Sequence, residues 1–224
     1  MKLVHVDCGY KDVTVLRDVT YEFEPNKIYG VVGHNGAGKT TMLRTIMGLL
    51  DLKNGEILDN SAGRIAYVPE RQGIYADLTV YENIKISLDL LGGCDEEEIN
   101  TLLNKWNLTT HKDKLAINLS TGLQARVKFI TARPNTAQFL ICDEPTLGVD
   151  ARTQKMISSE LNNCRKRGGT VIVTSHNLNF IESLCDEIMI INNQKMVYSG
   201  SISKIKDFES VYLEYTEEDN EKCG

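Results

Sequence analysis

The chain has 224 residues, of which 42 % are hydrophobic and 25 % charged, as expected of a globular protein with one core. Its net charge of −6 argues against sequence-independent binding of nucleic acid, which requires clustered Lys and Arg side chains. The six cysteines lack zinc or redox spacing, and the chain has neither an apolar leader nor an apolar run long enough to span a bilayer, which predicts a cytosolic protein with reduced thiols.

The N-terminal part is predicted to contain two antiparallel strands, a buried strand and a helix. Residues 2–7 and 19–24 alternate apolar and polar side chains, which is typical of half-buried strands. Residues 28–32 are almost continuously apolar, as in a central strand that is buried on both faces. A glycine-rich loop follows, and then apolar side chains recur at helical spacing over residues 42–47.

The loop "GHNGAGKTT" fits the pattern G-x-x-x-x-G-K-[ST] and lies between a predicted strand and a predicted helix, as that pattern requires. Its glycines let backbone N–H groups approach an anion, and the following helix adds the positive end of its dipole. Lys39 supplies a charge for the β- and γ-phosphates, and the Thr40 hydroxyl can ligate Mg²⁺. The predicted nucleotide-binding residues of the loop are Gly33, His34, Asn35, Gly36, Ala37, Gly38, Lys39, Thr40 and Thr41.

The middle of the chain is predicted to be helical. Thr79 and Glu82 form a capping box ahead of a helix that ends at a pair of glycines. Asp95 caps a second helix, and a third begins near Ser120 and ends at Pro134.

The last third alternates strands and helices, which predicts a parallel sheet. Buried strands are expected at residues 139–143 and 170–176, and Asp150 caps a helix that runs through Arg167 between them. Residues 187–199 are expected to form a hairpin.

Two adjacent carboxylates follow the strand "FLIC". Asp143 at the carboxyl end of a strand can hold Mg²⁺ beside the phosphate loop. Glu144 is not needed for the metal, so it can polarise the water that attacks the γ-phosphate. The alternative is that Glu144 is a solvated loop carboxylate.

The chain resembles the ATP-binding subunits of ABC (ATP-binding cassette) transporters over nearly its whole length. The resemblance rests on motifs in a fixed order: the phosphate loop, "YVPERQG" at the Q-loop, "LSTGL" at the signature, "LICDEPT", "LGVD" at the D-loop and the switch histidine in "TSH".

The resemblance implies roles for single residues. Tyr10 stacks on adenine, Glu70, Glu144 and His176 act in catalysis, and Thr40, Asp143 and Glu70 lie at the metal. The signature residues that contact ATP bound by a second chain, and the D-loop residue beside them, are Ser120, Thr121, Gly122 and Asp150. Taken alone, Tyr10 is a strand-end aromatic, His176 a core histidine and Asp150 a helix cap.

Two motifs depart from the family pattern. The Q-loop has Glu70 where most members have Gln, which places an additional carboxylate near Mg²⁺. The signature has Thr121 for its middle Gly and Leu123 for its final Gln. Such S-x-G variants are similar to those of small exporter subunits that work with separate permeases.

The expected fold is α/β, with a phosphate-loop NTPase core built on a parallel sheet, an N-terminal antiparallel β layer and an inserted helical subdomain. We place the ATP-binding core at residues 1–70 and 134–215, the helical subdomain at 71–133 and a flexible acidic tail at 216–224.

The resemblance implies that the chain hydrolyses ATP with Mg²⁺ as part of a homodimer or heterodimer of ATP-binding subunits. The dimer would power a separate integral membrane permease, and export is the leading interpretation. The chain would lie in the cytoplasm, at the inner face of the cell membrane. A groove at residues 70–82 would receive the permease, with Tyr75, Leu78 and Tyr81 as apolar contacts unless these side chains pack in the core. The alternatives are a soluble ABC ATPase, for example of the iron–sulfur cluster assembly type, and a regulator without hydrolysis, against which Glu144 and His176 argue.

Overall fold

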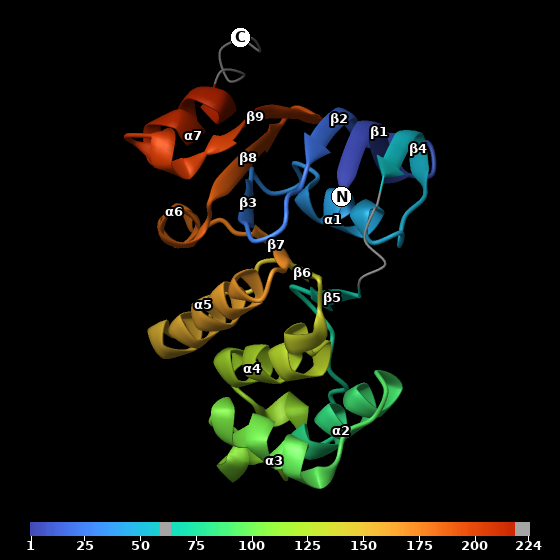
Figure 1. Ribbon diagram of the computed structural model, residues 1–224, viewed down its shortest axis with the longest axis vertical. Helices are drawn as coiled ribbons and strands as arrows, with labels where there is room; N and C mark the ends of the chain where they lie inside the picture. Colours follow the sequence, from blue (N-terminus) through green and yellow to red (C-terminus); the bar gives the residue numbers. More distant parts are fainter. Residues whose placement is uncertain (59–63, 218–224) are drawn as a thin grey trace.

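The computed structural model describes residues 1–58 and 64–217, which form two sheets and a group of helices at one end of the molecule (Figure 1). The first sheet has the strand order β2-β1-β4 and the second has the order β5-β6-β7-β3-β8-β9.

The first sheet is antiparallel. Strand β1 (Lys2–Tyr10) pairs with β2 (Val13–Glu22) on one side and with β4 (Leu52–Leu58) on the other. The two predicted N-terminal strands are therefore confirmed, but the second begins earlier and ends two residues before Glu24. The chain leaves the sheet there and turns at Asn26, whose φ is 63°.

The second sheet is parallel except at one edge. Its parallel strands are β3 (Ile28–Val32), β5 (Ile65–Val68), β6 (Phe139–Cys142), β7 (Thr170–Thr174) and β8 (Glu187–Asn192). The antiparallel edge strand β9 (Lys195–Ser201) forms the predicted hairpin with β8. Every residue of β3, β6 and β7 is buried, as their apolar runs predict.

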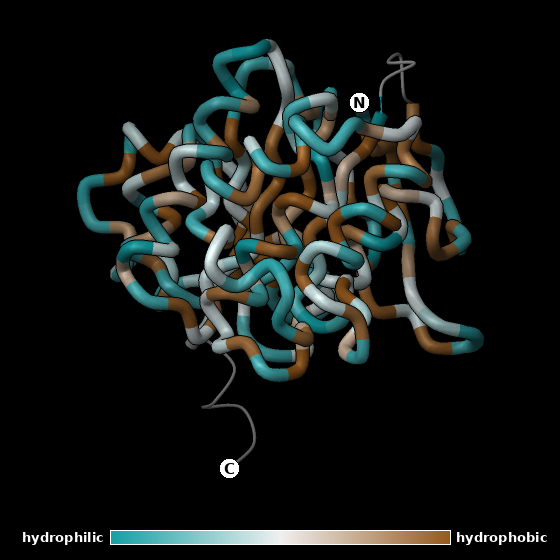
Figure 2. The backbone as a smooth tube through the Cα atoms, turned by 90° about the horizontal axis from the view of Figure 1, so that it is seen from below, coloured by the Kyte–Doolittle hydropathy of each residue, from teal (hydrophilic) through white to brown (hydrophobic). Residues whose placement is uncertain are grey.

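Helices cover both faces of this sheet. Helix α1 (Lys39–Ile46) lies between the two sheets, where Met42 and Leu43 pack in one core with Leu3 of β1 and Val31 of β3. The opposite face packs against α5 (Ala151–Lys166) and α6 (Leu178–Leu184). Figure 2 accordingly shows hydrophobic stretches of the backbone mainly in the interior of the molecule and hydrophilic stretches mainly on outer loops.

Helices α2 (Val80–Leu90), α3 (Glu96–Lys105) and α4 (Thr121–Ala132) lie together at the far end of the molecule (Figure 1). The predicted caps at Thr79, Asp95 and Ser120 each accept a hydrogen bond from the first turn of their helix. Trp106 stacks on Phe129 at a centroid distance of 5.4 Å and joins α3 to α4.

Several boundaries differ from the prediction. Helix α5 ends one residue before Arg167, and β7 ends at Thr174, so Ser175 and His176 lie in the turn to α6. Helix α7 (Phe208–Glu217) includes the first two residues of the predicted flexible tail, which are therefore helical. The rest of that tail, 218–224, lies outside the described residues.

Strands β4 and β5 and helix α6 are not predicted by the sequence patterns. Within residues 1–58 and 64–217, none of the helices combines the length and apolarity that a membrane crossing requires.

Candidate nucleotide-binding site

The phosphate loop occupies the turn from β3 to α1. Gly38 directly precedes the helix with φ 109°, a backbone conformation that residues other than glycine rarely adopt. A Cβ atom at this position would lie 2.9 Å from side-chain atoms of Leu16 and Val15. Because the loop is pressed against β2 here, glycine is required.

Lys39 lies beneath the loop, where its Nζ donates hydrogen bonds to the carbonyl oxygens of Gly33 at 2.7 Å and His34 at 3.2 Å. Burial lowers the pKa of Lys39, and the nearby carboxylates Glu144, Asp143 and Glu70 oppose that shift. The ammonium group therefore stands where the loop would hold phosphates.

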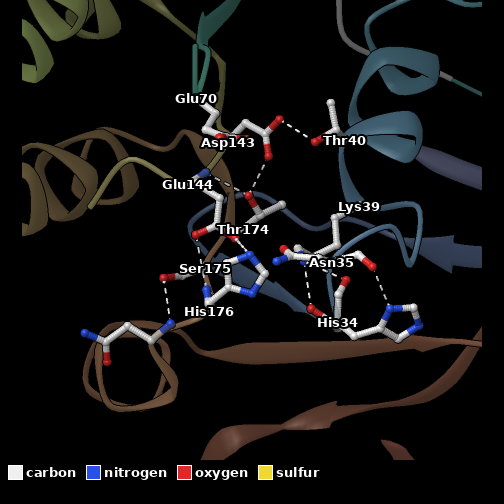
Figure 3. A network of polar contacts seen from close by, with 12 residues as sticks. His34, Asn35, Lys39, Thr40, Glu70, Asp143, Glu144, Thr174, Ser175 and His176 are labelled. Atoms are coloured by element: carbon white, nitrogen blue, oxygen red, sulfur yellow. Dashed lines mark hydrogen bonds and ion pairs between the residues drawn. The ribbon is translucent and has the colours of Figure 1, made fainter. Parts of the chain in front are cut away.

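Asp143 anchors the opposite wall of the site. Its Oδ2 accepts a hydrogen bond from Thr40 Oγ1 and its Oδ1 accepts one from Thr174 Oγ1, both at 2.7 Å (Figure 3). Its backbone N–H donates to the carbonyl oxygen of Val68 at 2.9 Å, so the end of β5 is bonded to this position as well.

A hydroxyl and a carboxylate that already share a hydrogen bond are a suitable donor pair for Mg²⁺, which prefers oxygen ligands. Among the residues described, no group of three or more His, Cys, Asp and Glu side chains could hold a metal ion. Mg²⁺ is commonly held by one or two carboxylates together with substrate phosphates and water, so Thr40 and Asp143 fit this ion.

Glu144 is buried with φ 47°, a left-handed conformation that is uncommon outside glycine. Its Oε2 accepts a hydrogen bond from the His176 backbone N–H at 3.2 Å. Its Oε1 lies 3.0 Å from His176 Nε2 without hydrogen-bond geometry and has no hydrogen-bond partner in the described chain. Burial raises the pKa of Glu144, although the His176 N–H and Lys39 oppose the shift. The second oxygen of this carboxylate is thus buried beside the His176 ring and has no hydrogen-bond donor in the described chain.

His176 faces the same carboxylate from the turn after β7 (Figure 3). Burial lowers the pKa of His176, with a further contribution from the positive charge of Lys39. Burial therefore favours the neutral imidazole, and the His176 backbone N–H holds Glu144 in place.

A cavity of about 190 Å³ brings most of the predicted site residues together. It is lined by residues 35–41 of the phosphate loop together with Glu70, Asp143, Glu144 and His176.

Gly33 and His34 adjoin this cavity through Lys39, and the other predicted residues do not line it. Tyr10 at the end of β1 is 41 % exposed, and its hydroxyl accepts a hydrogen bond from Arg44 at 3.3 Å. Ser120 and Thr121 are exposed at the start of α4. Asp150 caps α5 by accepting a hydrogen bond from the Thr153 N–H at 2.7 Å. A Cβ atom on Gly122 would lie 3.0 Å from Asp150 Oδ2, so the signature and the D-loop are in close contact within one chain.

Sequence patterns missed two polar residues that support the site. Thr174 contacts Asp143 from 31 positions away, and Lys128 contacts Glu70 from 58 positions away. Thr174 is the first residue of "TSH", of which only His176 has a predicted role, and Lys128 belongs to no motif.

Comparison with known proteins gives matches along most of the chain. A family model described as "ABC transporter" matches residues 16–147. An uncharacterized ABC transporter ATP-binding protein of Methanocaldococcus jannaschii is 34 % identical over 96 % of this chain and 82 % of its own length.

Two further relatives carry opposite directions of transport in their names. The lipopolysaccharide export system ATP-binding protein LptB of Haemophilus influenzae is 31 % identical over 92 % of each chain. The methionine import ATP-binding protein MetN of Clostridioides difficile is 29 % identical over 96 % of this chain and 71 % of its own length.

Solved structures share the fold. An ATP-binding subunit of an ABC transporter superposes with a TM-score of 0.84 at 24 % identity, covering 96 % of this chain and 98 % of the other. A dimeric ATP-binding cassette in a post-hydrolysis state with ADP and Pi gives a TM-score of 0.79 at 24 % identity, covering 90 % and 98 %.

Proposed function

Because the chain belongs to the ABC transporter family, as an ATP-binding cassette ATPase, we propose that it binds MgATP as one of two ATP-binding subunits that power a separate membrane permease. The predicted family, the α/β fold and the ATPase class are confirmed. The roles of single residues, the dimer, the permease and the direction of transport are proposals.

The observation that carries the catalytic proposal is the convergence of Lys39, Asp143 and Glu144 on one cavity. The loop N–H groups and the Lys39 ammonium bind the ATP phosphates. Mg²⁺, when bound, offsets phosphate charge, and Thr40 and Asp143 would hold it. Glu144 accepts the proton of the attacking water, which must reach the buried and unpartnered Oε1, while the backbone N–H of His176 fixes Oε2.

Glu70 belongs to the same cavity, and its side chain is about one third exposed beside Arg71. A carboxylate at this position can accept a hydrogen bond from the attacking water or lie near Mg²⁺. We assign it a supporting role, because Glu144 is the more buried carboxylate.

The dimer proposal rests on the position of the signature residues. Ser120 and Thr121 are exposed and do not line the cavity of their own chain. Ser120 and the N-terminus of α4 form an anion-binding end, so a second copy or a related subunit can present them to the phosphates across the interface. Tyr10 would then stack on the adenine in its own chain.

The permease proposal rests on the family and on the surface next to the Q-loop. Tyr75 is 58 % exposed there, whereas Leu78 is half-buried and Tyr81 packs against the main core. Of the three predicted docking contacts, Tyr75 is therefore the most exposed and the best placed to contact a partner. The exporter-like signature supports export, and the chain would lie in the cytoplasm, held on the inner face of the membrane by the permease.

Affinity purification of the tagged native chain from its own membranes tests this function. We expect a multi-span membrane protein to co-purify, and we expect Tyr75→Glu to reduce its recovery while ATP binding is retained. Val13→Glu is the matched control, because Val13 is 64 % exposed on β2 away from the Q-loop. If only soluble partners are recovered, the proposal of a transporter subunit is wrong and a soluble ABC ATPase takes its place.

A further inference from the structure

Three consecutive carbonyl groups at the end of β5 are held by two different parts of the protein. Val68 accepts a hydrogen bond from the backbone N–H of Asp143 at 2.9 Å. Pro69 and Glu70 accept hydrogen bonds from Lys128 Nζ at 3.4 and 2.6 Å. The start of the Q-loop is thus tied to the metal-site strand on one side and to helix α4 on the other.

The chain reverses immediately after these contacts. Gln72 and Gly73 both have positive φ, at 63° and 86°. A Cβ atom on Gly73 would lie 2.8 Å from the Pro69 ring and 3.8 Å from Lys128 Cγ, so the turn packs against the lysine stem. Between these contacts the Arg71 side chain is 89 % exposed.

The contact from Lys128 is stronger than an ordinary surface hydrogen bond. Lys128 is a half-buried residue, and a charged donor bonded to carbonyl oxygens forms a charge-assisted hydrogen bond. Burial lowers the pKa of Lys128, and the negative charge of Glu70 opposes the shift. The lysine also lines a cavity of about 250 Å³ that is shared by Glu70, Thr121 and Glu144.

We propose that Lys128 is a positioning residue that fastens the Pro69 and Glu70 carbonyls of the Q-loop to helix α4, so that Glu70 and the signature residues move together. Helix α4 carries Ser120 at its N-terminus, and Glu70 lines the phosphate cavity. A displacement of α4 is therefore transmitted to the Glu70 backbone through one side chain. The inference rests on the proposed function, because it concerns how α4 is coupled to hydrolysis.

Lys128→Met tests the proposal, because methionine keeps an unbranched stem and removes the donor. We expect kcat for ATP to fall about tenfold, since a hydrogen bond from a charged group contributes roughly one order of magnitude. The Kd for ATP should stay within about twofold, because the phosphate loop and Lys39 are untouched. Lys128→Arg, which restores charged donors, should recover most of the activity.

Two further measurements separate positioning from general stability. Tryptic cleavage after Arg71 should be faster in Lys128→Met than in the wild type, with an unchanged melting temperature. Lys85→Met is the matched control, because Lys85 on α2 forms only a surface pair with Asp89 at 3.4 Å. This control should leave kcat, Kd and the cleavage rate at their wild-type values.

A double substitution identifies the partner of the ammonium group. If Lys128 acts on the backbone carbonyls, Lys128→Met should lower kcat by the same factor in a Glu70→Gln chain. Loss of the effect in that background would overturn the proposal, because the relevant contact would then be with the Glu70 carboxylate. An unchanged kcat in Lys128→Met would overturn it as well. An absence of hydrolysis in the wild type would instead contradict the proposed function.

Discussion

At the scale of single residues, the site depends on buried polar side chains that hold one another in place. Asp143 uses both carboxylate oxygens to accept hydrogen bonds from threonines, so its orientation is fixed before any metal binds. Glu144 has one oxygen fixed by a backbone N–H and one without a hydrogen-bond partner in the described chain. This difference supports the holding role proposed for Asp143 and the proton-accepting role proposed for Glu144.

Glu144→Gln should therefore bind ATP and hydrolyse it very slowly. The amide keeps an oxygen for the His176 N–H but cannot accept the proton of water, and loss of a general base lowers the rate by roughly 10²–10⁴-fold. Single-turnover hydrolysis and ATP calorimetry check both halves of the prediction. Glu56→Gln on the exposed β4 strand is the control and should keep the wild-type rate. If Glu144→Gln hydrolyses ATP nearly as fast as this control, Glu144 is not the general base.

The pH dependence of kcat gives a second test of Glu144. Burial raises its pKa above that of an ordinary glutamate, and the base must be deprotonated to act. As the pH falls through this raised pKa, the active fraction is lost, so the acid limb should lie at a higher pH than an ordinary carboxyl would give. The residual rate of Glu144→Gln should lack this limb. Circular dichroism at each pH excludes unfolding as its cause.

Only some of the site residues could be predicted from the sequence. The phosphate loop and the Asp143–Glu144 pair are visible because their residues are adjacent in the chain and follow buried strands. The roles of Thr174 and Lys128 could not be predicted, because their contacts with Asp143 and Glu70 form only when distant segments of the chain pack together. No local pattern records such contacts.

At the scale of helices and strands, caps and continuous apolar runs could be predicted, whereas short or exposed strands could not. All seven residues of β4 are exposed or partly exposed, so no alternation of polar and apolar side chains marks it. It is recognised only through its backbone pairing with β1. Strand β5 has four residues, too few to show a period.

The capping box at the start of α2 provides a quantitative test at this scale. Thr79 Oγ1 accepts from the Glu82 N–H at 3.2 Å, and the Glu82 carboxylate accepts from the Thr79 N–H at 2.7 Å. Thr79→Ala should lower the free energy of unfolding by about 1 kcal/mol. Urea denaturation measures the change. Thr101→Ala, at an exposed position within α3, should cause no loss, and equal effects of the two substitutions would contradict the role of the cap.

At the scale of the whole molecule, the two groups of residues proposed to bind phosphate lie on different elements of the fold. The phosphate loop follows the carboxyl end of β3, and Asp143 and Glu144 follow that of β6, whereas Ser120 and Thr121 lie at the start of α4. Helix α4 belongs to the helical group at the far end of the molecule (Figure 1). Within a chain, α4 is linked to α5 by the buried Arg126, whose Nη2 donates to Thr153 at 2.7 Å. One chain thus presents a proposed phosphate site and, outside the phosphate-loop cavity, a helix end proposed to bind an anion.

The proposed head-to-tail dimer predicts that these two groups act in different chains. Ser120→Arg adds bulk and charge at the start of α4, so it should leave ATP binding to the isolated chain intact but prevent dimer closure and hydrolysis. Lys39→Ala should impair ATP binding instead, because it removes the ammonium group beneath the loop. Ser120→Ala is the control for loss of the cap bond without added bulk, and it should still form a dimer with ATP.

Mixing the two inactive variants gives the decisive measurement for a homodimer. A mixed head-to-tail pair contains one site with both defects and one site that combines an intact Lys39 from one chain with an intact Ser120 from the other. ATPase activity should therefore reappear on mixing, whereas neither variant alone is active. If Ser120 acted in its own chain, every site in the mixture would carry a defect and no activity would return. A mixture as inactive as its components, with mixed dimers demonstrated by differently tagged chains, would therefore contradict the shared site.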